Sequence, residues 1–536
     1  MSSELPPLRG NIVDYLFEPS LGSDLASRAC LTTPEGDTSF QELHERCCQV
    51  GNLVGSLGLK RGDRVMFSVL DGADFMSLFL GVMKVGSVSL PINTFLTVKD
   101  YAYYLRDSHA RMLVIDESLV PLIKQVGEIQ ALPEHVFVTG KETAGFRSLE
   151  DALQKQAKDV PTCECKPDDV AFWLYSSGST GDPKGVLHTH AHIHASCELF
   201  GRNTVGLTKD DVIVCPPKMF FAFGLGFQVY MPLRACARVV ADAQPGRPQR
   251  VWEIIQQHRP TLLVAVPTIF SGLIDILKHV KKESIEHVFE PLRFCISGGE
   301  VLAPSLVRSW KELTDTDILD GVGTTEMTHM FVINRPGQVV PGSSGKVVEG
   351  YQVRLVDENW KDVPCGEIGN MFAIGPSAAQ QYWNKPEKTA ATMREGGVLT
   401  GDKFYQDQDG NYFYVGRNDD MLRAGGIWVS PAEIENTLLE HVDIAECAVI
   451  GVEDEHRLVK PKAYVVLREG TVPTSELEQA IKEAVRLKLA HYKCPRWIEF
   501  IDSLPKTATG KIQRFKLRER ADSTQQGPAV EARQSA

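Results

Sequence analysis

The chain has 536 residues, too many for one hydrophobic core, so its length predicts at least two domains. Hydrophobic residues make up 43% and charged residues 24% of the chain, the proportions of an ordinary globular protein. The net charge of −12 argues against a nucleic-acid-binding surface, and no apolar run reaches the roughly 18 residues of a membrane span.

The N-terminal segment lacks the charged and then apolar pattern of a secretory signal. The 12 cysteines are scattered, and none forms the Cys-x-x-Cys spacing typical of zinc sites. We therefore expect a cytoplasmic protein with free thiols, most of them in the core.

Helical and strand patterns alternate in the first part of the chain. Residues 40–57 and 75–82 have apolar residues at helical spacing, and residues 64–69 and 87–90 are typical of strands. This βαβ pattern predicts a parallel sheet covered by helices, with ligands bound beyond the carboxyl ends of the strands. Further strands that lead into loops are predicted at residues 171–174, 212–214, 262–266 and 294–296.

The pattern changes between residues 342 and 416, where short strands alternate with turns rich in Gly and Asp. This texture predicts a mostly antiparallel or barrel-like unit. A compact stretch of strand and helix signals follows, including a strand at 462–467 and a helix at 475–489. We place the domain boundary at Asp419, which gives a large domain over residues 1–418 and a small one over 419–520. Residues 521–536 are polar and nonperiodic, which predicts a disordered tail.

Residues 175–185, Tyr-Ser-Ser-Gly-Ser-Thr-Gly-Asp-Pro-Lys-Gly, form the most informative segment of the chain. Glycines let backbone N–H groups approach oxyanions, hydroxyls add donors, and the lysine balances the charge. An ordinary linker is the alternative, but linkers rarely follow a buried strand directly. The spacing fits neither G-x-x-x-x-G-K-[ST] nor G-x-G-x-x-G. We therefore predict a phosphate-binding loop of a different kind.

This loop resembles that of the adenylate-forming enzymes, the superfamily of acyl-CoA ligases, peptide-synthetase adenylation domains and luciferases. Further segments match in the order the family has them, so the resemblance covers nearly the whole chain. It implies an α/β fold: a large N-terminal domain of parallel α/β sheets with a small β-barrel-like unit, then a small mobile α+β domain. Residues 172–175, 220–226 and 323–329 look most like benzoate–CoA ligases.

The resemblance implies an enzyme that joins a carboxylic acid to AMP from ATP and then transfers the acyl group to CoA. By this match Glu326 and Thr180 hold Mg²⁺, and Lys511 is the catalytic lysine. Asp402 matches the ribose-binding aspartate, Arg417 matches its companion contact to the ribose or phosphate, and Asp419 matches the hinge. The other matched positions in the ATP and CoA sites are Ser176, Ser177, Gly178, Ser179, Gly181, Lys184, Gly298, Gly299, Glu300, Asp320, Gly321, Gly323, Thr324, Thr325, Gly425, Gly426 and Trp428.

The same match indicates which residues would line the acid site. Benzoate ligases commonly have Tyr where Phe223 stands and Ala where Gly298 stands, so we expect a slightly larger and less polar pocket here. A ring with a small substituent would fit, such as 2-aminobenzoate or a hydroxybenzoate, as well as benzoate itself. The implied pocket residues are Ala222, Phe223, Gly298, Gly323, His329 and Met330.

One alternative acceptor and one alternative acid substrate stay open at this point. An aryl-acid adenylation enzyme could load an acyl carrier protein, because its arm ends in the same pantetheine thiol as CoA. A medium-chain fatty acid ligase would need a longer tunnel.

Four histidines alternate directly after the phosphate loop, at positions 188, 190, 192 and 194. The alternation suggests a metal site. We expect these residues to enter a helix, however, where alternate positions do not share a face. A metal site is therefore not predicted here.

Overall fold

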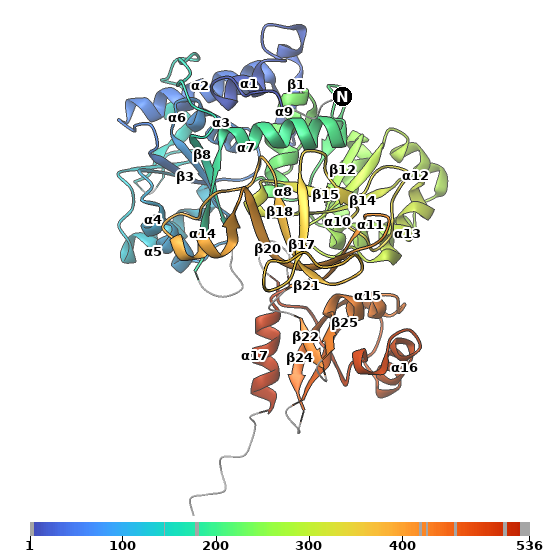
Figure 1. Ribbon diagram of the computed structural model, residues 1–536. Coiled ribbons are helices and arrows are strands. Elements are labelled where there is room, and N and C mark those ends of the chain that lie inside the picture. Colours follow the sequence, from blue (N-terminus) through green and yellow to red (C-terminus); the bar gives the residue numbers. More distant parts are fainter. Residues whose placement is uncertain are drawn as a thin grey trace, which may run out of the picture.

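The computed structural model describes residues 5–143, 145–176, 182–417, 421–424, 427–454, 458–506 and 512–525. Its larger part contains two big sheets that share a hydrophobic core, and a third sheet that lies beside both (Figure 1). A smaller unit, formed by the C-terminal part of the chain, lies below this body in Figure 1.

The first large sheet has seven strands in the order β7-β6-β5-β3-β4-β8-β9. All neighbours are parallel except β8 and β9, which form a hairpin. Helices α2 and α3 pack on one face and α4 and α5 on the other, which confirms the predicted βαβ arrangement. The elements are α2 (Phe40–Ser56), β3 (Arg64–Ser68), α3 (Ala73–Lys84), β4 (Val88–Pro91), α4 (Val98–Ser108), β5 (Met112–Ile115), α5 (Val120–Ile129), β6 (His135–Val138), β7 (Arg147–Ser148), α6 (Leu149–Leu153), β8 (Val170–Ser176) and β9 (Lys184–Thr189).

The second large sheet has nine strands in the order β16-β15-β14-β13-β12-β10-β11-β1-β2. Its six central strands, from β14 to β1, are parallel, and antiparallel strands close both edges. Helices α10 to α13 cover its outer face. The strands are β1 (Ala29–Thr33), β2 (Gly36–Ser39), β10 (Val212–Val214), β11 (Arg238–Val240), β12 (Leu262–Ala265), β13 (Phe294–Ser297), β14 (Ile318–Gly323), β15 (Met330–Ile333) and β16 (Lys346–Val347); the helices are α10 (Pro248–His258), α11 (Pro267–Leu277), α12 (Lys282–Phe289) and α13 (Pro304–Thr314).

Short helical segments fill the shared core between the two large sheets. Two of them are π-helical, a rare geometry that often marks functional sites. These segments are α1 (Ile12–Phe17), α7 (His190–Ala195), η3 (Ser196–Val205), α8 (Ala222–Leu225), η4 (Gly226–Tyr230) and α9 (Met231–Ala235).

The third sheet is fully antiparallel, as the sequence predicted for residues 342–416. Its last two strands, β20 and β21, bring the chain to the domain junction. The elements are β17 (Gln352–Val356), β18 (Gly369–Ile374), α14 (Pro386–Thr392), β19 (Met393–Arg394), β20 (Gly397–Gln406) and β21 (Tyr412–Arg417).

The C-terminal unit is an α+β domain with cores of its own. A three-stranded sheet, β24-β25-β26, packs α15 and α16 on one face and α17 on the other. An ion pair of 2.7 Å between Arg468 and Asp275 of α11 joins this unit to the large domain. The elements are β22 (Leu422–Ala424), β23 (Ile427–Val429), α15 (Pro431–Leu438), β24 (Ile444–Glu453), β25 (Val459–Leu467), α16 (Ser475–Arg486), β26 (Trp497–Phe500) and α17 (Arg514–Gln525).

The predicted start of the disordered tail at Ala521 is wrong, because α17 continues to Gln525. Ala521 and Leu517, one helical turn apart, are buried against Ala448 and Tyr464 of the small sheet. Two apolar positions in a polar segment are too few to produce a periodic signal. The hinge residue Asp419 lies outside the described residues, so the domain boundary stays a prediction.

All 12 cysteines are free, and most are buried, as expected. Among the described segments, no helix is both long enough and apolar enough to cross a membrane.

The packing of α17 leads to a stability prediction. Leu517→Ala removes a side chain that is 1% exposed, and we expect it to lower the free energy of unfolding of the C-terminal domain by about 2–5 kcal/mol. Phe515→Ala, at a position that is 47% exposed, is the control and should change it little. Denaturant titration checks both. Equal losses would mean that α17 is not anchored through Leu517.

Candidate active site

The predicted metal residue, Glu326, lies where the two large sheets meet. It is part of η5 (Thr325–Met327), in the connection between β14 and β15. Ser176 ends β8 of the other sheet, and its hydroxyl donates to Glu326 Oε1 over 3.2 Å. Ser176 also pairs with Lys184 across the β8–β9 hairpin. The ends of the phosphate loop are therefore held at the Glu326 carboxylate.

Glu326 is 8% exposed and still ionised. Burial alone would raise its pKa, but the Thr324 hydroxyl, the Lys184 charge and the Tyr382 hydroxyl together hold the pKa below its usual value. The Tyr382 hydroxyl donates to Oε1 over 2.8 Å, and Thr324 Oγ1 donates to Oε2. A single ionised carboxylate among hydroxyls is the kind of donor set that Mg²⁺ uses when it is also bound by phosphates.

Lys184, at the other end of the phosphate loop, is half-buried beside Tyr382. Its Nζ lies 3.4 Å from the Tyr382 hydroxyl and 4.5 Å from the centre of that ring. Burial lowers the pKa of Lys184, and the charges of Lys388 and Arg417 act in the same direction, whereas Glu326 opposes them. The lysine is thus placed to interact with an anion at the loop.

Tyr382 is a site residue that the sequence reasoning missed. It precedes α14, in the excursion that joins β18 to β19, so the third sheet contributes directly to the site. The next residue, Trp383, donates its backbone N–H to Gly185 O over 2.8 Å, which fixes this segment against β9. A tyrosine between strands has no periodic signal, and only the tertiary contact identifies it.

The two predicted ribose residues are neighbours in the third sheet. Asp402 of β20 pairs with Arg417 of β21, and Arg417 Nε lies 3.7 Å from Asp402 Oδ1. Gly401, at φ +80°, bends β20 immediately before the aspartate. The charge of Arg417 also acts to lower the pKa of Lys184.

The predicted nucleotide-cradle residues lie on two adjacent parallel strands, directly after β13 and within β14. Residues 298–300 come directly after β13, and Asp320 is paired with Ser297 where β13 and β14 lie side by side. Asp320 Oδ1 and Ser297 Oγ are buried, and neither finds a hydrogen-bond partner within the described ranges. Burial raises the pKa of Asp320 well above its usual value. Buried polar atoms without partners are typical of a surface that receives a polar ligand.

The structure brings the predicted acid-site residues together in an aromatic cluster. The rings of His329 and Phe223 are 6.2 Å apart, and His329 also packs against Phe200 at 4.6 Å and Phe227 at 4.9 Å. Phe200 and Phe227 belong to the two π-helical segments, and neither was predicted. Ala222 begins α8 beside Phe223, and Gly323 pairs with Met330 across β14 and β15.

His329 is a neutral ring in this cluster. Burial lowers its pKa to about 3, against a smaller opposing effect of the Phe223 backbone, and neither ring nitrogen forms a hydrogen bond of normal geometry within the described part of the chain. Gly226 is needed for this packing, because a Cβ there would lie 2.3 Å from His329 Cδ2.

Gly298 does not enlarge the acid site in the simple way that we expected. A Cβ at this position would lie 2.2 Å from Met330 Cε and 3.7 Å from Phe223 Cζ. Met330 therefore occupies the space that an alanine methyl group would take. The Met330 side chain thus fills the space left by the missing methyl group at position 298, because a close-packed interior leaves few voids.

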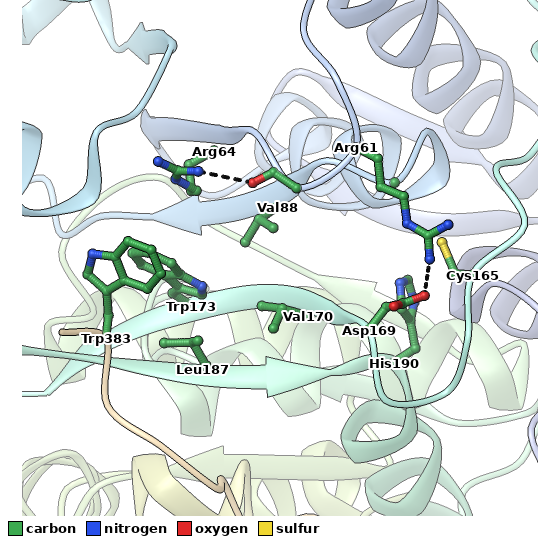
Figure 2. A pocket seen from close by; sticks show the side chains of 12 residues that line it. Arg61, Arg64, Val88, Cys165, Asp169, Val170, Trp173, Leu187, His190 and Trp383 are labelled. Atoms are coloured by element: carbon green, nitrogen blue, oxygen red, sulfur yellow. Dashed lines mark hydrogen bonds and ion pairs between the residues drawn. The ribbon is translucent and has the colours of Figure 1, made fainter. Parts of the chain in front are cut away.

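The phosphate loop leads into strand β9, and not directly into a helix as expected. His188 lies in β9, whereas the other three histidines lie in α7. No group of three or more His, Cys, Asp or Glu side chains suited to a metal occurs among the described residues. His190 instead lines a hollow of about 220 Å³ at the amino-terminal half of β8, next to the ion pair of Arg61 and Asp169 (Figure 2).

Several predicted site residues lie outside the described residues, and their roles stay predictions. They are Ser177, Gly178, Ser179, Thr180, Gly181, Asp419, Gly425, Gly426 and Lys511. Trp428 lies in strand β23, and its role also stays a prediction.

Comparison with known proteins decides the family. The AMP-binding enzyme family matches residues 24–383, and the AMP-binding enzyme C-terminal domain matches residues 433–511. The chain belongs to the AMP-binding enzyme family. The predicted enzyme class, an adenylate-forming acid–thiol ligase that resembles benzoate–CoA ligases, is thereby confirmed.

Individual relatives match over almost their full length. A benzoate–CoA ligase of Thauera aromatica is 42% identical over 515 residues, which cover 96% of each chain. The crystal structure of an anthranilate CoA ligase in complex with anthranoyl-AMP has a TM-score of 0.92 at 39% identity, covering 98% of this chain and 100% of that one. A benzoate CoA ligase from Burkholderia xenovorans LB400 has a TM-score of 0.88 at 36% identity, covering 95% and 99%.

The contacts of Tyr382 predict that removal of its hydroxyl slows adenylation. Tyr382→Phe removes a hydrogen bond to a buried charge, worth about 1.5–3 kcal/mol, so adenylation should fall about tenfold to a hundredfold. Tyr412→Phe, which removes a hydroxyl bonded to Val353 O in the third sheet, is the matched control. Acid-dependent ATP–pyrophosphate exchange measures both. A wild-type exchange rate in Tyr382→Phe would show that this hydroxyl has no role in adenylation.

Proposed function

We propose that this chain is an aryl acid–CoA ligase that uses ATP, Mg²⁺ and CoA. In the first step a carboxylate oxygen of the acid forms a bond to the α-phosphorus of ATP, and pyrophosphate leaves. In the second step the CoA thiolate sulfur bonds to the acyl carbon of the acyl-AMP, and AMP leaves.

The observation that carries this proposal is the position of the aromatic cluster. It adjoins the segment that bears Glu326: Met330 fills the space that a Cβ on Gly298 or Gly321 would take, and a Cβ on Gly323 would lie 2.8 Å from the His329 carbonyl oxygen. A flat apolar ring would thus be bound next to the nucleotide site, with its carboxylate facing the phosphates. The 42% identity to a benzoate–CoA ligase and the 39% identity to an anthranilate CoA ligase support an aryl acid.

Each proposed catalytic role follows from local chemistry. Glu326, with Thr180, would hold Mg²⁺, which would supply positive charge to neutralise the phosphates. Ser176 and Lys184 would contact the phosphates at the two ends of the loop, and Lys511 would stabilise the negative charge that develops between the carboxylate and the α-phosphate.

The acid that we propose is benzoate, 2-aminobenzoate or a hydroxybenzoate. Phe223 adds no hydroxyl to the cluster, and the neutral His329 can both donate and accept a hydrogen bond. A fatty acid ligase and an enzyme that loads a carrier protein are the competing proposals. We infer a cytoplasmic location from the free thiols, since disulfides form in oxidising compartments.

The first test is a panel of acids. We expect benzoate, 2-aminobenzoate and the hydroxybenzoates to exceed hexanoate and octanoate in kcat/KM for CoA ester formation, because the cluster would enclose one ring. Free CoA and a phosphopantetheinylated carrier protein are compared as acceptors at equal concentration. Octanoate as the best acid, or transfer to the carrier protein alone, would contradict the proposal.

The exchange of volume between Gly298 and Met330 gives a second test. Gly298→Ala must displace Met330 Cε, and overpacking of this kind costs about 1–3 kcal/mol. We expect a larger loss of kcat/KM for substituted benzoates than for benzoate, and recovery when Met330→Leu is added. Gly55→Ala, where an added Cβ meets nothing within 4 Å, is the control. An equal loss of kcat/KM for all acids would show that Gly298 does not line the acid site.

The third test separates the two half-reactions. Proline fixes φ, so Asp419→Pro should hold the small domain in one arrangement, most simply the adenylating one. The exposed Arg468–Asp275 pair is too weak to do so, at about 0–1 kcal/mol. Pyrophosphate exchange should survive while thioester formation collapses.

Lys511→Ala should show the opposite pattern, with transfer from supplied acyl-AMP retained and adenylation lost. Asp419→Ala, which leaves φ free, is the control for the proline variant. Equal loss of both half-reactions in folded Asp419→Pro and Lys511→Ala proteins would contradict the proposed domain rotation.

A further inference from the structure

The histidine run after the phosphate loop contains a buried pair that the proposed chemistry does not use. His188 has no exposed surface and His192 is 4% exposed. Their Nδ1 atoms lie 3.2 Å apart, and the ring of Phe172 stacks on His188 at 4.9 Å. Burying two polar rings costs free energy unless their nitrogens form hydrogen bonds, so the partners of these nitrogens indicate what holds the pair in place.

The partner of His188 is the turn that carries Glu326. His188 Nε2 lies 2.9 Å from the carbonyl oxygen of Thr325. A carbonyl oxygen can only accept, so Nε2 carries the proton and donates. The Thr328 hydroxyl lies 3.1 Å from the other ring nitrogen, Nδ1. One imidazole therefore contacts the residue before Glu326 and the residue two positions after it.

This turn is strained and held from several sides. Thr328 has φ +67° and ψ −44°, a conformation that β-branched residues rarely adopt and that persists only where surrounding contacts enforce it. Three consecutive carbonyls accept from outside the turn: Thr325 O from His188, Glu326 O from Ala379 N–H at 2.8 Å, and Met327 O from the Ser377 hydroxyl at 2.7 Å.

His192 packs against the other side of His188, with the two ring centres 5.4 Å apart and the rings edge to face. The Thr189 N–H donates to His192 Nδ1 over 3.3 Å at the start of α7. His188 thus lies between the first turn of α7 and the Glu326 turn. Since His188 is only four residues beyond Lys184, this contact couples the phosphate-loop hairpin to the carboxylate.

We propose that His188 is a positioning residue, which sets the direction of the Glu326 carboxylate by holding the Thr325–Thr328 turn. It acts through Thr325 O and has no part in the chemistry itself. The inference rests on the proposed role of Glu326 toward Mg²⁺ and ATP.

The test compares two amide side chains at position 188. A glutamine amide can reach the place of Nε2 and donate to Thr325 O, whereas the shorter asparagine amide reaches only the place of Nδ1. The probe is the thermal stabilisation of each protein by Mg²⁺ at a fixed concentration of a non-hydrolysable ATP analogue. Loss of such an indirect contact typically weakens metal affinity about 10- to 100-fold.

We expect His188→Asn to raise the Mg²⁺ concentration for half-maximal stabilisation about tenfold or more, and His188→Gln to stay near wild type. KM for Mg·ATP should rise more than kcat falls. In the ligand-free protein, amide hydrogen exchange over residues 324–330 should be faster in His188→Asn only. His188→Met, similar in length and without a donor, replaces the Asn variant if that protein does not fold.

His190→Asn is the matched control. His190 is equally buried, and its Nδ1 accepts from the backbone N–H of Ile12, away from the Glu326 turn. This variant should leave the Mg²⁺ dependence unchanged. Wild-type Mg²⁺ dependence in folded His188→Asn or His188→Met would overturn the inference.

Glu326→Gln separates this inference from the proposed function. If that variant also binds Mg²⁺ like the wild type, the proposed metal role of Glu326 is wrong. If it loses the Mg²⁺ response while the His188 variants keep theirs, only the positioning role is wrong.

Discussion

A buried, ionised carboxylate at the meeting point of three sheets is the constraint on which the rest of this site depends. Glu326 can stay charged only because its oxygens accept from Ser176, Thr324 and Tyr382 while Lys184 lies nearby. A buried charge without such partners would be strongly destabilising. Because the donors come from all three sheets, the carboxylate gains all of its partners only when the three sheets of the large domain are packed together.

Behind that carboxylate, the structure changes from polar to apolar within a few residues. The connection between β14 and β15 places Glu326 toward the phosphate loop and His329 toward Phe200 and Phe227. The two phenylalanines come from π-helical segments, whose irregular geometry brings the rings close to a neutral imidazole. One short connection thus joins the predicted nucleotide site to the aromatic cluster, which is the arrangement that the proposed adenylation of an aryl acid would require.

Much of the fold was predictable from periodicity alone. The alternation of helices and strands before residue 342, the antiparallel unit after it and the α+β character of the C-terminal unit all follow from local patterns. Two predictions failed for the same reason, since tertiary contacts decided them. The chain after the phosphate loop pairs with β8 as a strand, and α17 extends through Ala521 because two side chains find a buried partner.

The sequence by itself determined the family and predicted residues whose types its chemistry needs, such as Glu326, Asp402 and Lys184, because these stand in short motifs with characteristic neighbours. Only the tertiary structure revealed the contacts of Tyr382 and His188 with the Glu326 turn and the exchange of volume between Met330 and Gly298. These side chains act through contacts with residues far away in the sequence, and no local pattern records which distant groups the folded chain will bring together.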